Sequence, residues 1–240
     1  MPSWGGSVGW LVPARRQGPE ILDDPATDAL VVRRSLADVA RANALFGGRR
    51  AVCRELADLL AASRGETLTL LDVGTGCGDV PAAARVLARR CGTCLRTIAV
   101  ESSAPLAAAA QGPDLPVARG TALALPFRDR SIDIVICSQL LHHFNDDAAA
   151  RVLREMNRVA RRCVIVSDLR RSWLAAGGIW LASWPLLFHP VSRHDGVLSV
   201  LRGYTVPELR DLVHDAIGRV PVARTRAGFR VATAWTPTEG

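Results

Sequence analysis

Three glycines and one aspartate make up the segment of the sequence that is best suited to bind a ligand. Asp72 is followed by Gly74, Gly76 and Gly78, between an apolar run and a helix-like stretch. Glycines at this spacing let the backbone turn sharply and let a ligand approach the main chain. The spacing is one residue shorter than the GxGxxG of dinucleotide-binding loops, and Asp72 would repel a pyrophosphate and attract an ammonium group. The loop is therefore predicted to bind a ligand with a positively charged group.

A second acid closes the next apolar run. Glu101 follows residues 97–100, and ligands of open α/β sheets bind at the carboxyl ends of the strands. A carboxylate offers two acceptor oxygens, which suit the two hydroxyl donors of a ribose. The implied ligand has an amino group and a ribose and needs no phosphate contacts.

Four stretches, taken in order, carry a resemblance to a known family. They are residues 70–79, 99–103, 119–144 and 164–168. Through them the chain resembles the class I S-adenosylmethionine-dependent methyltransferases, in particular the ubiquinone/menaquinone-biosynthesis-like small-molecule group. The resemblance implies S-adenosylmethionine as cofactor, S-adenosylhomocysteine as product and no metal.

The resemblance also assigns parts of the cofactor to residues. The three glycines would line the methionine part, and Glu101 would bind the ribose. Thr121 and Ala122 would flank the adenine, although the family usually has an aspartate where this chain has Thr121, whose hydroxyl is a weaker acceptor. Ser138 and Gln139 would close the floor of the pocket. The residues predicted to bind the cofactor are Asp72, Gly74, Thr75, Gly76, Gly78, Glu101, Ser102, Thr121, Ala122, Ser138, Gln139 and Arg41.

Histidines are the candidates for catalysis. Methyl transfer from a sulfonium is an in-line displacement that needs alignment and exclusion of water, and it needs a base only where the nucleophile must lose a proton. His142 and His143 lie in the loop that faces the methyl group in the resembled family, and either could be that base. His194 lies between an arginine and an aspartate and could deprotonate a phenol. His143, His142 and His194 are therefore predicted to be catalytic, with a structural role as the alternative.

An uncharged segment follows the predicted fifth strand. Residues 172–192 carry no formal charge, and an insert at 172–203 is predicted to be a helical lid or a surface that touches a membrane transiently. A buried core helix is the alternative, whereas a membrane-spanning helix is disfavoured because Pro185 and a glycine pair interrupt the run. The residues expected to bind substrate are Trp180, Trp184, His189, Arg193, His194 and His143.

Apolar runs alternate with helical stretches, which predicts a parallel sheet covered on both faces. Runs at 220–226 and 229–235 flank Ala227-Gly228 and predict an antiparallel hairpin. The fold class is therefore α/β, a Rossmann-like, mostly parallel seven-stranded sheet with a C-terminal antiparallel hairpin and helices on both faces. The other predicted elements are strands at 68–73, 97–100, 116–119, 132–137 and 163–167 and helices at 80–90, 104–110 and 147–159.

Helical periodicity over residues 28–62, broken at Gly47-Gly48, predicts two helices that cover the cofactor. Arg34, Arg41 and Asn43 are the candidates on these helices to reach the methionine carboxylate. The predicted domains are a flexible tail at 1–20, a helical cover at 21–66 and a methyltransferase domain at 67–240.

Composition limits the chemistry and the partners. The 30 basic residues are all arginine, which excludes Schiff-base chemistry, a lysine base and a P-loop lysine. The arginines behind the net charge of +7 are scattered rather than grouped, so a nucleic-acid partner is disfavoured. Among six cysteines, Cys91 and Cys94 form a lone CxxC, which is not enough for a zinc site. With no signal-peptide pattern, a cytoplasmic protein, at most peripheral to a membrane, is predicted.

The sequence therefore predicts a methyltransferase whose acceptor is an apolar or aromatic small molecule. O- or C-methylation in secondary metabolism or in quinone- or lipid-like biosynthesis is expected. A nucleic-acid or protein methyltransferase and a cofactor-binding module without turnover are the alternatives. The N-P-P-[YF] motif of amino-directed nucleic-acid enzymes is absent, and Ser138-Gln139 stands in its place.

Overall fold

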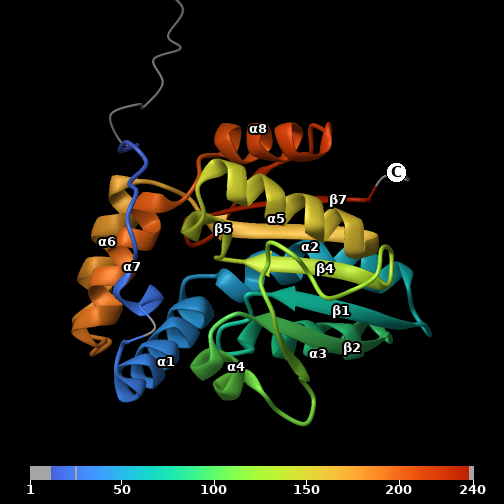
Figure 1. Ribbon diagram of the computed structural model, residues 1–240, viewed down its shortest axis with the longest axis horizontal. Helices are drawn as coiled ribbons and strands as arrows, with labels where there is room; N and C mark the ends of the chain where they lie inside the picture. The colour runs from blue at the N-terminus through green and yellow to red at the C-terminus, as the bar shows by residue number, and fades with distance from the viewer. Residues whose placement is uncertain (1–11, 25, 238–240) are drawn as a thin grey trace, which may run out of the picture.

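The computed structural model describes residues 12–24 and 26–237. Its strands are β1 (Thr67–Val73), β2 (Cys94–Glu101), β3 (Val117–Arg119), β4 (Ile132–Ser138), β5 (Ala160–Leu169), β6 (Arg224–Arg226) and β7 (Arg230–Trp235). They form one seven-stranded sheet in the order β3-β2-β1-β4-β5-β7-β6 (Figure 1). The first five strands pair in parallel, and β7 is antiparallel to β5 and β6. The predicted Rossmann-like sheet with its antiparallel hairpin is thus confirmed.

The strands follow the apolar runs but differ from them in length. β4 is buried from Ile132 to Cys137, since helices cover both of its faces. β5 begins at Ala160, before the predicted run, because backbone pairing with β4 continues there. β6 is confined to Arg224–Arg226, whereas the prediction began at residue 220. Pro221 lacks a backbone N–H for a ladder hydrogen bond, which accounts for the shorter strand.

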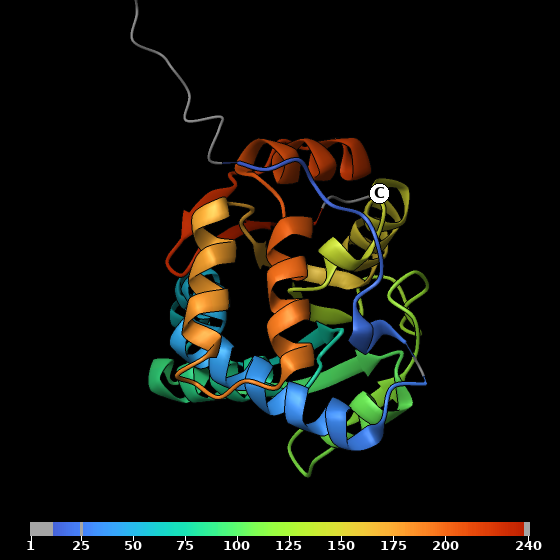
Figure 2. The ribbon, with the colours of Figure 1, turned by 90° about the vertical axis from the view of Figure 1, so that its left-hand side faces the viewer.

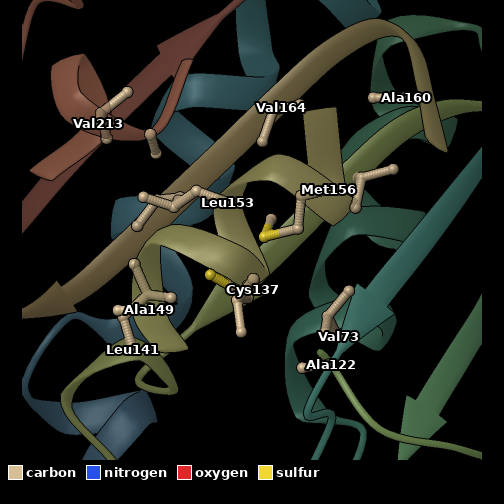
Figure 3. Packing of buried hydrophobic residues seen from close by; sticks show 14 of the residues in the cluster. Val73, Ala122, Cys137, Leu141, Ala149, Leu153, Met156, Ala160, Val164 and Val213 are labelled. Carbon is tan, nitrogen blue, oxygen red and sulfur yellow. The ribbon is translucent and has the colours of Figure 1, made fainter. Parts of the chain in front are cut away.

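Helices cover the sheet on both faces and at one end. They are α1 (Ala29–Leu45), α2 (Gly48–Ala62), α3 (Asp79–Cys91), α4 (Ala104–Ala110), α5 (Asp146–Val159), α6 (Trp173–Ser183), α7 (Pro190–Arg202) and α8 (Val206–Ile217), with 3₁₀ turns η2 (Ile21–Asp23) and η3 (Leu141–His143). One core lies between the sheet and α5 and α8, where Leu153 and Met156 of α5 meet Cys137 and Val164 (Figure 3). The other core lies between the sheet and α2 and α3.

Helices α1, α6 and α7 lie together beyond the carboxyl ends of the parallel strands (Figures 1 and 2). α6 and α7 lie side by side, and α1 packs against α7. The segment predicted as a lid thus forms two helices, since α6 ends before Pro185 and Pro190 begins α7. None of the helices in residues 12–24 and 26–237 has the length and apolar character that a membrane span requires.

The segment that precedes η2 packs against the rest of the molecule. Arg15 donates a 2.8 Å hydrogen bond to the hydroxyl of Tyr204 and stacks 4.1 Å from the centre of its ring. Arg15 thus holds part of residues 12–20 against the rest of the molecule, whereas the flexibility predicted for residues 1–20 stays a prediction. The rest of that predicted tail, residues 1–11, lies outside the described part of the chain.

Candidate active site

The glycine loop between β1 and α3 leaves an open cradle. Gly74, Gly76 and Gly78 have φ values of 70°, 55° and 73°, a backbone region that favours glycine. A Cβ on Gly74 would lie 2.6 Å from the side chain of Leu140, so this position is tightly packed. A Cβ on Gly76 would have no atom within 4 Å. The loop therefore packs on one side and is free to receive a ligand on the other.

Carboxylates surround this loop. Asp72 is 2% exposed and accepts a 2.7 Å hydrogen bond from Thr75 Oγ1. Glu101, at the end of β2, accepts the N–H of Gly76 at 3.2 Å. Burial, followed by the charges of Asp79 and Glu101, raises the pKa of Asp72 to about 7, against the effect of the Thr75 hydrogen bond. The loop therefore concentrates negative potential, which suits a cationic ligand.

The residues predicted for the adenine and the pocket floor lie at the same edge of the sheet. Thr121 Oγ1 accepts the N–H of Leu123 at 3.2 Å, so this hydroxyl stabilises its own turn. Ala122 is buried beside it, and Ser102 is exposed. The hydroxyl of Ser138 is buried and has no hydrogen-bond partner among the described residues, so it is free to bind a ligand.

Arg41 lies elsewhere than predicted. Its guanidinium forms an ion pair with Asp38, donates to the carbonyl of Leu186 and is half-exposed. Asn43, another of the three candidates on these helices, instead accepts a hydrogen bond from Gln139 Nε2 at the floor of the pocket. The helical period explains the difference, because residues 41 and 43 point to different sides of α1.

His142 is buried in a charged network. Its Nδ1 lies 2.6 Å from Asp168 Oδ1, and its Nε2 lies 3.7 Å from Glu20 Oε1. Burial alone would lower the pKa of this imidazole, but Asp168 and Glu20 outweigh burial and raise it to about 9. His142 is therefore cationic at neutral pH and cannot accept a proton. This result corrects the prediction that His142 is a candidate base.

His143 is placed differently from its neighbour. Its side chain is 28% exposed, and its Nδ1 lies 3.0 Å from Asp23 Oδ1. The carboxylate favours the tautomer with the proton on Nδ1, which leaves a lone pair on Nε2. Nε2 lies 3.9 Å from Glu20 Oε2, beyond hydrogen-bond distance. His143 is thus oriented by an acid, and its Nε2 has no hydrogen-bond partner at these distances.

Glu20 and Asp23, which lie next to the two histidines, also contact an arginine. Arg202 Nη1 lies 3.4 Å from both Glu20 and Asp23. The possible ligand atoms of Glu20, His142 and His143 lie within 4.8 Å of one another, a spacing that would admit a metal ion. Arg202 and cationic His142 already supply positive charge to these carboxylates, so the donors are engaged without a metal. The expectation that no metal is needed stays a prediction.

A cavity of about 350 Å³ lies between the carboxyl end of the sheet and helices α1, α6 and α7. His143 and Gln139 line it on the side of the cofactor loop, and Arg230 lines it at the start of β7. The size falls within the range of roughly 300–1,000 Å³ that is usual for small-molecule sites. Its apolar wall includes Phe46, Ile179, Phe188 and Phe229.

Most side chains expected to bind substrate lie outside this cavity. Trp180 and Trp184 are 47% and 53% exposed on the outer side of α6 and its following turn, and their rings meet edge to face. Arg193 stacks 3.7 Å from the ring of Trp184. His194 is 59% exposed beside Asp195. The wall from α6 consists instead of small and aliphatic residues such as Ile179.

His189 also has a structural role rather than the predicted binding role. It is the N-cap of α7, where its Nδ1 accepts the N–H of Val191 at 3.3 Å. Its own N–H donates to Asp38 at 2.8 Å. The membrane contact predicted for the uncharged segment stays a prediction, and the exposed tryptophans are the side chains on that segment that are available for it.

Sequence reasoning missed three residues of the site. Glu20 and Asp23 fell in or next to the predicted tail, and no motif links them to the histidines. Arg230 carries a detectable signal, because it is a charged residue at the start of a short apolar strand.

Comparisons with known proteins agree with this geometry. Residues 71–165 match the family described as a methyltransferase domain. No curated protein sequence matches the chain. An S-adenosylmethionine-dependent methyltransferase from Aquifex aeolicus is 16% identical, with a TM-score of 0.54 over 78% of this chain and 89% of that one.

Two further solved structures share the fold. An O-methyltransferase from neocarzinostatin biosynthesis, in complex with S-adenosylhomocysteine and 1,4-dihydroxy-2-naphthoic acid, is 16% identical, with a TM-score of 0.62 over 91% of this chain and 62% of that one. Magnesium protoporphyrin IX methyltransferase from Synechocystis, with bound S-adenosylhomocysteine, is also 16% identical, with a TM-score of 0.52 over 80% and 84% of the two chains. At these identities the likeness is one of fold.

The fold, the glycine loop and the domain match over residues 71–165 together make the chain similar to class I S-adenosylmethionine-dependent methyltransferases. Two of these solved structures contain S-adenosylhomocysteine. The narrower ubiquinone/menaquinone-like group stays a prediction.

Proposed function

We propose that this chain is an S-adenosylmethionine-dependent methyltransferase, and that it methylates a hydroxyl group of an apolar, aromatic small molecule that binds in the 350 Å³ cavity. The observation that carries the proposal is the position of His143, an acid-oriented histidine in the wall of a largely apolar cavity at the carboxyl end of the sheet. The neocarzinostatin enzyme, which shares the fold, was solved with a hydroxylated naphthoic acid. A cavity capped by α6 and α7 favours a small acceptor over a nucleic acid or a protein.

The loop residues fit the cofactor. The free side of Gly76, the unpartnered hydroxyl of Ser138 and the carboxylate of Glu101 offer a cradle, a donor and a ribose acceptor. The negative potential around Asp72 matches a ligand with a sulfonium and an ammonium group. When bound, S-adenosylmethionine supplies an electrophilic methyl group.

The chain's own residues then prepare the acceptor. The apolar part of the wall and the helices α6 and α7 hold the ring and reduce its contact with water. His143 Nε2 accepts the proton of the acceptor hydroxyl, while Asp23 holds Nδ1–H and stabilises the imidazolium that forms. His142 remains cationic and orients the loop through Asp168.

Glu101→Ala tests the cofactor site. We expect binding of S-adenosylmethionine, measured by calorimetry, to weaken by about 1–3 kcal/mol, because charge-assisted hydrogen bonds to the ribose are lost. Glu66→Ala is the matched control, since Glu66 directly precedes β1, at the end of the strand away from the glycine loop, and forms an ion pair with Arg162. Equal affinities of the wild type and Glu101→Ala would contradict the assignment of Glu101. Absence of methyl transfer to any arene hydroxyl by wild-type enzyme that binds the cofactor would contradict the proposed function.

Cofactor affinity should depend on pH through Asp72. Below the raised pKa of about 7, Asp72 is neutral, and above it the group is ionised and attracts the cationic cofactor. Affinity should therefore rise as the pH increases from about 6 to about 8, by roughly three- to tenfold, and then level off. Calorimetry at several pH values measures this change. Asp72→Asn should remove the dependence, and a variant that keeps the wild-type slope would show that another group is responsible.

A further inference from the structure

Arg230 is a buried cation without a partner. It begins β7 and is 4% exposed. Its Nε has no hydrogen-bond partner, and no ion pair within residues 12–24 and 26–237 includes its guanidinium. Burial lowers its pKa to about 10, against the effect of Asp168, so the group stays charged at neutral pH. A buried charge without a partner is strongly unfavourable, and its presence calls for an explanation.

The acids near the cavity do not neutralise this charge, because each has other partners. Asp168 binds His142 and the N–H of Leu169. Glu20 binds a serine hydroxyl and an arginine. Asp38 accepts the N–H of His189 and forms an ion pair with an arginine. Asp195 accepts two backbone N–H groups and lies within hydrogen-bond distance of His194 Nδ1. Arg230 therefore lines the cavity without a hydrogen-bonded or ion-paired carboxylate among the described residues, and Asp168 acts on its charge only from a longer distance.

The hairpin holds Arg230 in a fixed position. Arg230 pairs with Leu169 of β5 and with Arg226 of β6 in the backbone ladder. The turn before it packs so closely on the end of α1 that a Cβ on Gly228 would lie 1.7 Å from the carbonyl oxygen of Phe46. Because the backbone of Arg230 is fixed in this way, binding of a ligand does not have to pay for ordering this part of the chain.

The cofactor loop lies too far away to use this charge. The loop follows β1, and β4 and β5 stand between β1 and β7 in the sheet. Neighbouring strands are about 4.8 Å apart, so three spacings separate the two strands by roughly 14 Å. Arg230 lines the cavity and not the glycine loop, so we assign the anion that would meet it to the molecule in the cavity.

We propose that the acceptor carries a carboxylate, and that Arg230 binds it while the hydroxyl to be methylated faces His143. This inference rests on the proposed function and narrows its substrate class to hydroxylated aromatic carboxylic acids. A guanidinium binds a carboxylate through two parallel N–H donors, which fixes the orientation of the ring as well as its affinity. Arg230 and His143 would thus select both the acid and the position of the hydroxyl.

A pair of matched probes tests the proposal without turnover. The enzyme loaded with S-adenosylhomocysteine is titrated with 1-hydroxy-2-naphthoate and with 1-hydroxy-2-naphthamide, which share the ring and differ in charge. We expect the wild type to prefer the acid by about 10- to 100-fold. Arg230→Met should bind the acid about as weakly as the amide. Arg224→Met is the matched control, because Arg224 is exposed on the same hairpin, and it should keep the preference.

The outcomes separate the two proposals. If both probes bind the wild type equally, the carboxylate assignment is overturned, and this comparison does not depend on the folding of any variant. If neither probe binds, the proposed function is contradicted, because the cavity then does not accept a hydroxylated aromatic ring. If Arg230→Met is folded and keeps the preference for the acid, Arg230 is not the carboxylate ligand. If it loses affinity for S-adenosylhomocysteine instead, the cation serves the cofactor and the inference is wrong.

Discussion

Replacing His143 by glutamine is expected to lower kcat for an aromatic hydroxyl acceptor by about 10²- to 10⁴-fold. Glutamine keeps a polar side chain of similar reach but cannot accept a proton from a phenol. Nδ1 of His143 is held 3.0 Å from Asp23, so the histidine presents Nε2 in the basic tautomer. Cofactor binding should be unchanged, because the cofactor loop and Glu101 are untouched. Steady-state rates at saturating S-adenosylmethionine, with calorimetry for the cofactor, measure both quantities.

His214→Gln is the control for this substitution. His214 is exposed on the last turn of α8, away from the cavity, and its loss should leave kcat within about twofold of the wild type. A His143→Gln enzyme with wild-type kcat would show that no general base is required. A loss confined to cofactor affinity would place His143 in the cofactor site instead.

The contrast between His142 and His143 shows where sequence reasoning ends. Both follow β4 in the same loop, and the sequence treats them alike. Tertiary contacts separate them, because Asp168 comes from β5 and Glu20 and Asp23 come from a segment more than a hundred residues earlier in the chain. No local sequence pattern predicts which carboxylate will form a hydrogen bond with which imidazole.

The fold can be predicted because it depends on local patterns in the sequence, whereas the roles of the two histidines depend on tertiary contacts. Each buried strand is a local run of apolar residues, and the glycine loop with Glu101 lies at the ends of two such runs. Helix α6 lacks that information, because it is apolar on all sides and its sequence does not indicate which face is inside. The sequence therefore predicts that Trp180 and Trp184 bind substrate, although Ile179 is the residue of that region that lines the cavity.

The same dependence on tertiary contacts makes Gly228 the position most sensitive to a small change. Gly228→Ala should lower the free energy of unfolding by about 2–5 kcal/mol. This is the sum of a left-handed backbone cost of about 1–2 kcal/mol and an overpacking cost of about 1–3 kcal/mol. Its φ is 73°, and a Cβ there would lie 1.7 Å from the carbonyl oxygen of Phe46 and 2.5 Å from the carbonyl carbon. Both are backbone atoms and cannot move aside as a flexible side chain could. Urea denaturation measures the change.

Gly218→Ala separates the two costs. Gly218 has a φ of 69° at the end of α8, but a Cβ there would have no atom within 4 Å. Its substitution should therefore cost only the left-handed backbone term, about 1–2 kcal/mol. Equal losses in the two variants would show that the turn moves freely from α1. If the Gly228→Ala loss is larger, the turn is fixed against α1, and the hairpin that carries Arg230 is a rigid wall of the cavity.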